Sequence, residues 1–223
     1  MNRKEELAQS LSRVRAELSE MTDRAIQLVV VTKTYPVEDL LLLYELGVRD
    51  FGENRVQELA EKAPQLPDDV RFHMIGSLQS NKINALLPHV HMLQSLDRVS
   101  LAKALGKRLK KPLDTLLEIN IADDANKQGM DPEEIPAVLA AVKPFPLLRV
   151  RGMMVMGSHT DDDSVIREDF KRANQLFASL KKEENEQVRM EILSMGMSGD
   201  YRIAAQEGAS MIRVGSAILG ERS

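Results

Sequence analysis

The sequence predicts a single α/β domain, a (β/α)8 barrel preceded by one extra helix. From residue 27 onward, short apolar stretches alternate with amphipathic stretches of helical period, and this unit repeats eight times. Strands joined by helical crossovers of this length lie parallel in a sheet. No glycine-, serine- or proline-rich linker divides the 223 residues, so we expect residues 1–223 to form one barrel near the minimum length of that fold.

The elements follow from these patterns in chain order. Residues 3–20 carry one apolar helical stripe, which predicts a leading helix that covers one end of the fold. Strands are expected at residues 27–33, 48–52, 70–76, 89–94, 114–121, 147–156, 190–194 and 210–214. Helices are expected at residues 36–46, 54–62, 79–87, 97–110, 132–142, 163–184 and 199–207, with a short one from about 216.

An open, doubly wound sheet is the alternative architecture. Such a sheet usually has fewer strands and a glycine-rich turn after the first one. Here the first predicted strand is followed by Thr34, Tyr35 and Pro36, which cannot cradle a pyrophosphate. The barrel is therefore favoured.

Composition and charge exclude several classes of function. The net charge of −4 gives no general attraction to nucleic acid or to an anionic membrane. Without cysteine, the chain has no disulfide, thiol nucleophile or thiolate metal site. No apolar run reaches membrane-spanning length, and the amino terminus has no apolar signal core. We therefore expect a cytoplasmic globular protein.

Residues 27–33 carry the first functional hypothesis. Their apolar, β-branched run is typical of a strand that is buried on both faces, and it ends in Lys33. Folds of the α/β class place their ligands at the carboxyl ends of the strands. A lysine that is desolvated there can lose its proton and attack a carbonyl carbon. The alternative is a lysine whose amine simply reaches solvent at the end of a strand.

The ends of the last two predicted strands suggest a phosphate site. Residues 213–217 lead from a strand into a helix, so we expect the amides of Gly215 and Ser216 to be unpaired donors at a positive helix end. Residues 194–200 add two serine hydroxyls after the preceding strand. Barrels often bind phosphate with the loops after strands seven and eight. The alternative for each segment is a serine N-cap beside a structural glycine.

Taken together, these strand ends suggest a cofactor. A lysine that can form a Schiff base, an arginine and a phosphate cradle at one barrel mouth point to pyridoxal 5′-phosphate, an aldehyde that carries a phosphate. A sugar-phosphate aldolase would also use a lysine and a phosphate site, but it needs an acid or base near the lysine, and none is obvious. The predicted rim has no histidine and carboxylate cluster suited to a metal ion.

Residues 72–82, with the sequence Phe-His-Met-Ile-Gly-Ser-Leu-Gln-Ser-Asn-Lys, closely resemble the signature of the YggS/PROSC-type pyridoxal phosphate homeostasis proteins. Shorter segments resemble the other motifs of that family and extend the likeness from the first strand to the end of the chain: residues 31–33, 51–54, 127–129, 194–198 and 213–215. The resemblance implies pyridoxal phosphate fold type III, a barrel like the amino-terminal domain of alanine racemase.

The resemblance also implies the site residues. Lys33 would carry pyridoxal phosphate as an internal aldimine, and Arg213 would face the pyridine nitrogen. Four further residues are implied to hold the phosphate, namely Ser194, Ser198, Gly215 and Ser216. Two are implied to line the pocket, namely Asn54 and Ser77.

A carrier or buffer of pyridoxal phosphate, without established catalytic turnover, is the function that the resemblance implies. Arginine stays protonated, so a guanidinium at the ring nitrogen keeps that nitrogen unprotonated and the ring a poor electron sink. Alanine racemases take a second base from a carboxyl-terminal β-domain of the partner subunit, which we expect this chain to lack. We expect a monomer without enzymatic activity that gives its cofactor to apoenzymes or to small amines and amino acids.

Two alternatives remain at the level of the sequence. The first is an enzyme, either an amino-acid racemase that uses pyridoxal phosphate or a Schiff-base aldolase. The second is an interaction protein that docks through the charged helix predicted at residues 163–184, although a solvated helix with ion pairs between successive turns is the simpler interpretation.

Overall fold

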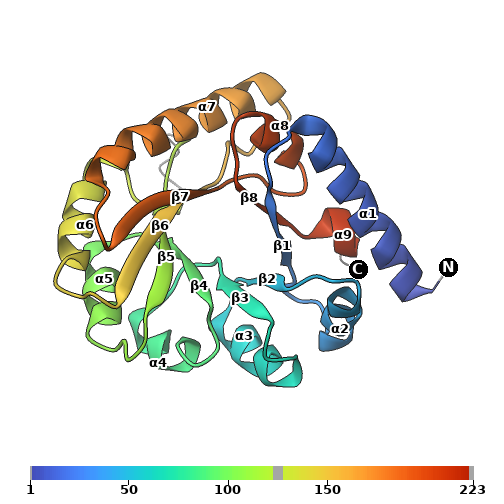
Figure 1. Ribbon diagram of the computed structural model, residues 1–223, viewed down its shortest axis with the longest axis horizontal. Helices are drawn as coiled ribbons and strands as arrows, with labels where there is room; N and C mark the ends of the chain where they lie inside the picture. Colours follow the sequence, from blue (N-terminus) through green and yellow to red (C-terminus); the bar gives the residue numbers. More distant parts are fainter. Residues whose placement is uncertain (1, 123–127, 221–223) are drawn as a thin grey trace.

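The eight strands close into a parallel barrel, as predicted. The computed structural model describes residues 2–122 and 128–220. The strands follow chain order around the barrel, the first strand pairs with the eighth, and the helices lie outside them (Figure 1). The strands are β1 (Gln27–Val31), β2 (Asp50–Glu53), β3 (Arg71–Met74), β4 (Met92–Leu96), β5 (Leu113–Ile119), β6 (Leu148–Val155), β7 (Val188–Ser194) and β8 (Met211–Val214).

Each strand is followed by an α-helix, and one α-helix precedes the first strand. The helices are α1 (Arg3–Met21), α2 (Val37–Glu45), α3 (Val56–Lys62), α4 (Ile83–Leu86), α5 (Val99–Gly106), α6 (Ile135–Val142), α7 (Asp163–Leu180), α8 (Tyr201–Gln206) and α9 (Ser216–Leu219). Short 3-10 helices cover Ala63–Gln65, Ser80–Lys82, Pro132–Glu134 and Lys181–Glu183. None of the helices within the described ranges is long and apolar enough to cross a membrane.

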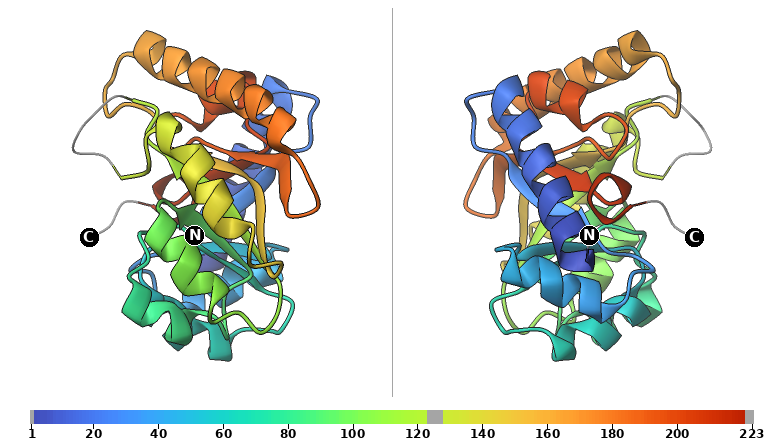
Figure 2. Two further views of the ribbon diagram at one scale, coloured as in Figure 1. Left: turned by 90° about the vertical axis from the view of Figure 1, so that its left-hand side faces the viewer. Right: turned by 90° about the vertical axis from the view of Figure 1, so that its right-hand side faces the viewer.

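The leading helix α1 covers the side of the barrel where the chain ends. Asn2 caps it by accepting a hydrogen bond from the amide of Glu5 at 3.0 Å. Arg3 joins it to its neighbours, with hydrogen bonds of 2.8 Å to Asp39 of α2 and 2.9 Å to the carbonyl of Leu219 in α9. Figure 2 shows α1 lying against α8 and α9. Its buried face consists of Leu7, Leu11, Val14 and Leu18.

Side chains of the strands alternate between the barrel interior and the layer beneath the helices. The interior holds a small apolar cluster consisting of Val29, Met92, Leu116, Met154 and Met211. Gln94 and Arg213 lie two residues after Met92 and Met211, so they share the inward face. Both are buried, so polar groups lie inside the barrel next to the apolar cluster, on the side towards the carboxyl ends of the strands.

Several predicted elements were too long. The strand predicted at residues 27–33 ends at Val31, because Thr34 has a φ of 71° and the chain turns there. The amide of Thr32 still donates to the carbonyl of Gly52 at 2.9 Å, so Lys33 is the first residue beyond the strand pairing. The helices predicted at 79–87, 97–110 and 163–184 shrink to α4, α5 and α7, with 3-10 turns before α4 and after α7.

Candidate functional site

A cavity of about 290 Å³ opens where the strands end at their carboxyl termini. The turn after β1, the ends of β2 and β3, β6, the loop after β7 and the junction of β8 with α9 form its wall. Its apolar wall includes Met154 and Met156 from β6 and the residue that follows. Six of the predicted site residues line it, namely Lys33, Asn54, Ser198, Arg213, Gly215 and Ser216.

Lys33 lies in a turn whose neighbouring peptide groups are both held by α3. The Nζ of Lys62 donates to the carbonyl oxygen of Thr32 at 2.8 Å. The carboxylate of Glu58 accepts a hydrogen bond from the amide of Thr34, also at 2.8 Å. A non-glycine residue keeps a left-handed backbone such as that of Thr34 only where its surroundings fix it. These two contacts therefore hold the backbone of Lys33 at the edge of the cavity.

A buried ion pair lies beneath this turn. Glu53 is fully buried, and its Oε1 accepts hydrogen bonds from Lys62 Nζ and Thr32 Oγ1, both at 2.7 Å. Burial raises the pKa of Glu53, and the hydrogen bond with Lys62 opposes that shift. The sequence analysis missed both residues of this pair. The only sign of Glu53 in the sequence was its place directly after a predicted buried strand. Lys62 had no such sign, because it belongs to the helix that follows.

Arg213 places a buried cation at the base of the cavity. Its Nη1 donates to Ser194 Oγ at 2.7 Å, and its Nη2 donates to the carbonyl oxygen of Val155 at 2.9 Å. Burial lowers the pKa of Arg213 to about 10, with the charges of Asp200 and Glu118 opposing that shift, so the guanidinium stays protonated at neutral pH. A guanidinium has five N–H donors, which leaves donors for a ligand in the cavity.

Ser198 joins the two predicted phosphate loops. Its Oγ accepts hydrogen bonds from the amides of Gly215, at 3.1 Å, and Ala217, at 3.2 Å. The prediction that the Gly215 amide is unpaired was therefore wrong, because the serine of the neighbouring loop reaches it. Ser216 lies between these two amides and is exposed at the rim. The hydroxyl of Ser198 thus holds the two loops together at the cavity.

Gly76 allows β3 to approach the end of β2 at the cavity. A Cβ atom on Gly76 would lie 2.3 Å from the carbonyl oxygen of Asn54, which is far inside contact distance. Only glycine fits there without a backbone shift. The position of Asn54 in the wall therefore depends on a glycine in the residues 72–82 segment.

Two predicted site residues lie outside the lining of the cavity. Ser194 is fully buried, and its hydroxyl donates to Gln94 Oε1 at 2.7 Å while accepting from Arg213. It contacts the guanidinium from inside the barrel. Ser77 is exposed, just after the end of β3. In the motif at 127–129, Lys127 lies outside the described residues, whereas Gln128 lines the cavity.

Glu118 is a second buried carboxyl group that the sequence analysis missed. Its side chain is only 1% exposed, and neither carboxyl oxygen has a hydrogen-bond partner in the part of the chain that the structure describes. Burial raises its pKa to about 7, and the charge of Asp97 raises it further, while Arg213 opposes the shift. A single glutamate in an apolar strand was the available signal. Over the described ranges, no group of three histidine, aspartate or glutamate side chains could hold a metal ion.

The cavity therefore combines an amine, a fixed guanidinium and a rim of hydroxyls and backbone amides with an apolar wall. An amine can bind a carbonyl group covalently, and the cation and the amides suit an anion. The cavity is at the small end of the range of about 300–1,000 Å³ that ligand pockets occupy. These groups suit a small, anionic carbonyl compound with an apolar part.

A family model and a curated relative both match most of this chain. The family model described as alanine racemase, N-terminal domain, matches residues 9–223. A pyridoxal phosphate homeostasis protein of Pasteurella multocida is 37% identical over 206 residues, which cover 90% of this chain and 88% of that protein.

Solved structures give the same fold. PipY of Synechococcus elongatus superposes with TM-scores of 0.87 without pyridoxal phosphate (PLP) and 0.85 with PLP bound, at 33% and 31% identity, and the match covers 96% of this chain and 100% of PipY. Alanine racemase of Corynebacterium glutamicum superposes with a TM-score of 0.74 at 17% identity, covering 96% of this chain and 60% of the racemase, which shows the shared fold alone.

Proposed function

The chain belongs to the pyridoxal phosphate homeostasis protein family, with the alanine racemase N-terminal domain fold, and from that premise we propose that it holds PLP and releases it to other acceptors. The barrel is of PLP fold type III. One observation carries the proposal. Lys33, Arg213 and the two loops joined by Ser198 line the same cavity, so an amine, a cation and anion donors face one small volume.

Each group of the cavity has a proposed task toward the cofactor. Lys33 would hold its aldehyde covalently, and Arg213 would face the ring nitrogen. Bound PLP supplies an aldehyde carbon that combines reversibly with amines. Ser198, Gly215 and Ser216 would hold the phosphate, and Asn54 would line the pocket. Ser194 would act through Arg213. Ser77, which is exposed outside the lining, has no proposed task.

The same geometry supports holding the cofactor over turning over a substrate. Arg213 stays protonated at neutral pH, because burial lowers its pKa only to about 10. A protonated guanidinium beside the ring nitrogen opposes protonation of that nitrogen, and an unprotonated pyridine is a poor sink for the electrons of a carbanion. We therefore propose a carrier that keeps a reactive aldehyde masked, and no catalytic role for the residues of the cavity.

The setting of this carrier is also part of the proposal. We propose that it acts in the cytoplasm, as a monomer whose residues 1–223 form one domain. Its recipients would be apoenzymes that need PLP, together with small amines and amino acids. These elements rest on the composition of the chain and on the name of its relatives.

Two measurements on the purified protein test the proposed function. Titration with PLP, followed by absorption spectroscopy, should produce a band distinct from that of free PLP. The loaded protein should then restore activity to an apoenzyme that needs PLP, and it should not racemise or deaminate a panel of amino acids faster than free PLP does. An unchanged spectrum would exclude the cofactor, and rapid turnover of an amino acid would replace the carrier with an enzyme.

A further inference from the structure

A row of buried hydrogen bonds leads from the base of the cavity into the barrel. Arg213 Nη1 donates to Ser194 Oγ at 2.7 Å, and Ser194 Oγ donates to Gln94 Oε1 at 2.7 Å. Gln94 Nε2 lies 3.1 Å from His73 Nδ1, and His73 Nε2 lies 3.0 Å from Asp50 Oδ1. None of the five residues is more than 6% exposed. We call this set the interior chain.

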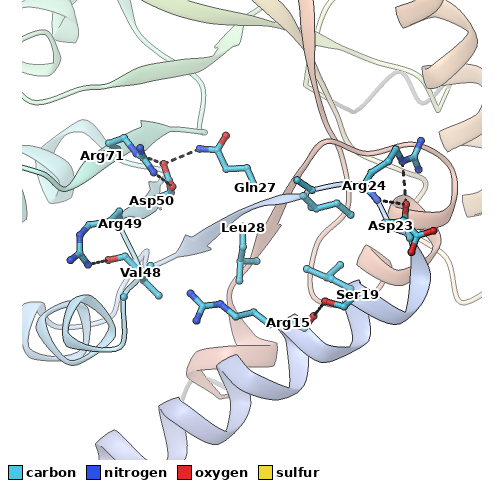
Figure 3. A pocket seen from close by; sticks show the side chains of 15 residues that line it. Arg15, Ser19, Asp23, Arg24, Gln27, Leu28, Val48, Arg49, Asp50 and Arg71 are labelled. Carbon is cyan, nitrogen blue, oxygen red and sulfur yellow. Dashed lines mark hydrogen bonds and ion pairs between the residues drawn. The ribbon is translucent and has the colours of Figure 1, made fainter.

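The interior chain ends at the opposite end of the barrel from the cavity that Lys33 and Arg213 line, which we call the PLP cavity. Asp50 accepts hydrogen bonds from Arg71, at 2.6 and 2.9 Å, and from Gln27 Nε2 at 2.9 Å. Figure 3 shows Gln27 and Arg71 both directed at Asp50. These three residues line a separate cavity of about 650 Å³ at the amino-terminal ends of the first strands. A connection of five side chains therefore spans the barrel.

The orientation of the Gln94 amide sets the directions in the middle of the interior chain. Arg213 can only donate, and the carboxylate of Asp50 can only accept. Ser194 donates to Oε1 of Gln94, and Nε2 of Gln94 faces the ring of His73. In this arrangement His73 accepts at Nδ1 and donates from Nε2 to Asp50. Loss of any link leaves buried polar groups unpaired, which proteins tolerate poorly.

Asp50 is ionised in this arrangement. Burial alone would raise its pKa, but the hydrogen bonds from His73 and Arg71 outweigh that effect and lower the pKa to about 2. Its negative charge lies at one end of a polarised row of hydrogen bonds whose other end is the positive charge of Arg213. Each bond in such a row strengthens its neighbours.

We propose that Gln94 and His73 are positioning residues for the cofactor: they fix the hydroxyl of Ser194 and, through it, the guanidinium of Arg213. The inference rests on the proposed function, because Arg213 is the cation assigned to the cofactor ring. Neither Gln94 nor His73 lines the PLP cavity. The environment of the cofactor therefore depends on a carboxylate and an arginine at the far end of the barrel.

The first test interrupts the interior chain at its middle. Gln94→Met removes the hydrogen bonds with Ser194 and His73, together with a third to Met211 Sδ, while keeping the volume of the side chain. We expect a shifted absorption maximum of bound PLP and release of PLP that is about threefold to tenfold faster, the effect of losing one net hydrogen bond. Met92→Leu is the matched control, because Met92 is a buried neighbour on the same strand with an apolar side chain. It should leave both quantities unchanged.

The second test acts from the far end. Arg71→Met removes the two hydrogen bonds that Arg71 donates to Asp50. The side chain of Arg71 is partly exposed, so the variant should fold normally. We expect a shift of the PLP absorption maximum in the same direction as for Gln94→Met. In the double variant the effect of Arg71→Met should vanish, because the connection is already broken. A wild-type spectrum and release rate in Arg71→Met, or simple addition of the two effects, would overturn the proposal.

A third measurement does not use the cofactor. In the PLP-free protein, 15N NMR should show His73 as a neutral ring with its proton on Nε2, and Gln94→Met should change the Nδ1 signal. A doubly protonated His73 at neutral pH would contradict the direction of the chain. A wild-type protein that takes up no PLP would defeat the proposed function, whereas uptake with unaltered variants would defeat the interior chain alone. Should Gln94→Met fail to fold, Arg71→Met decides.

Discussion

Lys62 Nζ lies 2.8 Å from the carbonyl oxygen of Thr32, the residue immediately before Lys33. The same ammonium lies 2.7 Å from Glu53 Oε1, on a side chain that is fully buried. Helix α3 thus fixes the turn that carries Lys33 through a buried ion pair. Lys62 contributes to the site in this way without lining the cavity.

Lys62→Met should destabilise the protein strongly. The substitution leaves Glu53 buried without its cation and frees the carbonyl of Thr32, and removal of one partner of a buried pair costs about 3–5 kcal/mol of unfolding free energy. Urea unfolding at pH 7 measures the change. Lys4→Met is the matched control, because Lys4 pairs with Glu45 at the same 2.7 Å but on the exposed surface. That variant should lose less than about 1 kcal/mol. Equal losses in the two variants would contradict the structural role of Lys62.

Asp50 should make the unfolding free energy depend on pH in the acidic range. Its pKa falls from an ordinary 3.8 to about 2 on folding, so the folded state binds the proton less readily than the unfolded state. The stabilisation is therefore present above about pH 4 and is lost as the pH falls towards 2; it amounts to roughly 2 kcal/mol. Asp50→Asn should flatten the curve of unfolding free energy against pH by about that amount.

The control for this pH dependence is Asp68→Asn, which removes an exposed carboxylate instead. Its curve should run parallel to that of the wild type between about pH 2 and pH 5. Parallel curves for Asp50→Asn would show that His73 and Arg71 do not hold Asp50 in its ionised form.

Glu118 should produce the opposite slope at higher pH. Its pKa rises from an ordinary 4.5 to about 7 on folding, so the folded state holds a proton that the unfolded state has lost. The unfolding free energy of the PLP-free protein should therefore decrease as the pH rises from about 4.5 through 7, by roughly 3 kcal/mol. Glu118→Gln removes this loss, so it should gain stability relative to the wild type between pH 5 and pH 8.

Exposed Glu133→Gln is the comparison for Glu118→Gln. It should keep the slope of the wild type, because it leaves the buried carboxyl group of Glu118 in place. A wild-type slope in Glu118→Gln would mean that its carboxyl group is hydrated in solution.

The barrel could be predicted because its helices and strands follow from the spacing of apolar residues within short stretches of sequence. The apolar runs of β1 and β5 and the stripe of α1 are properties of neighbouring residues. Boundaries were harder to predict. The residues after Val31 do not predict the left-handed backbone of Thr34, because the contact that fixes it comes from Glu58 in α3.

The side-chain contacts of the site could not be predicted for a related reason. Ser194 meets Gln94 across 100 residues of sequence, and only barrel closure brings β4 and β7 to opposite sides of one interior. Ser198 reaches Gly215 because the loops after β7 and β8 are neighbours. Sequence can place a residue at a strand end, but the choice between a ligand and another side chain depends on these non-local contacts.

Reduction of the PLP-loaded protein with borohydride, followed by peptide mass mapping, tests the central claim most directly. The reduction makes the bond between cofactor and lysine permanent, so the modified residue can be read from the peptides. We predict one major adduct, on Lys33, that is lost in Lys33→Ala together with the absorption band of the bound cofactor. An adduct on a different lysine, with Lys33 unmodified, would contradict the account.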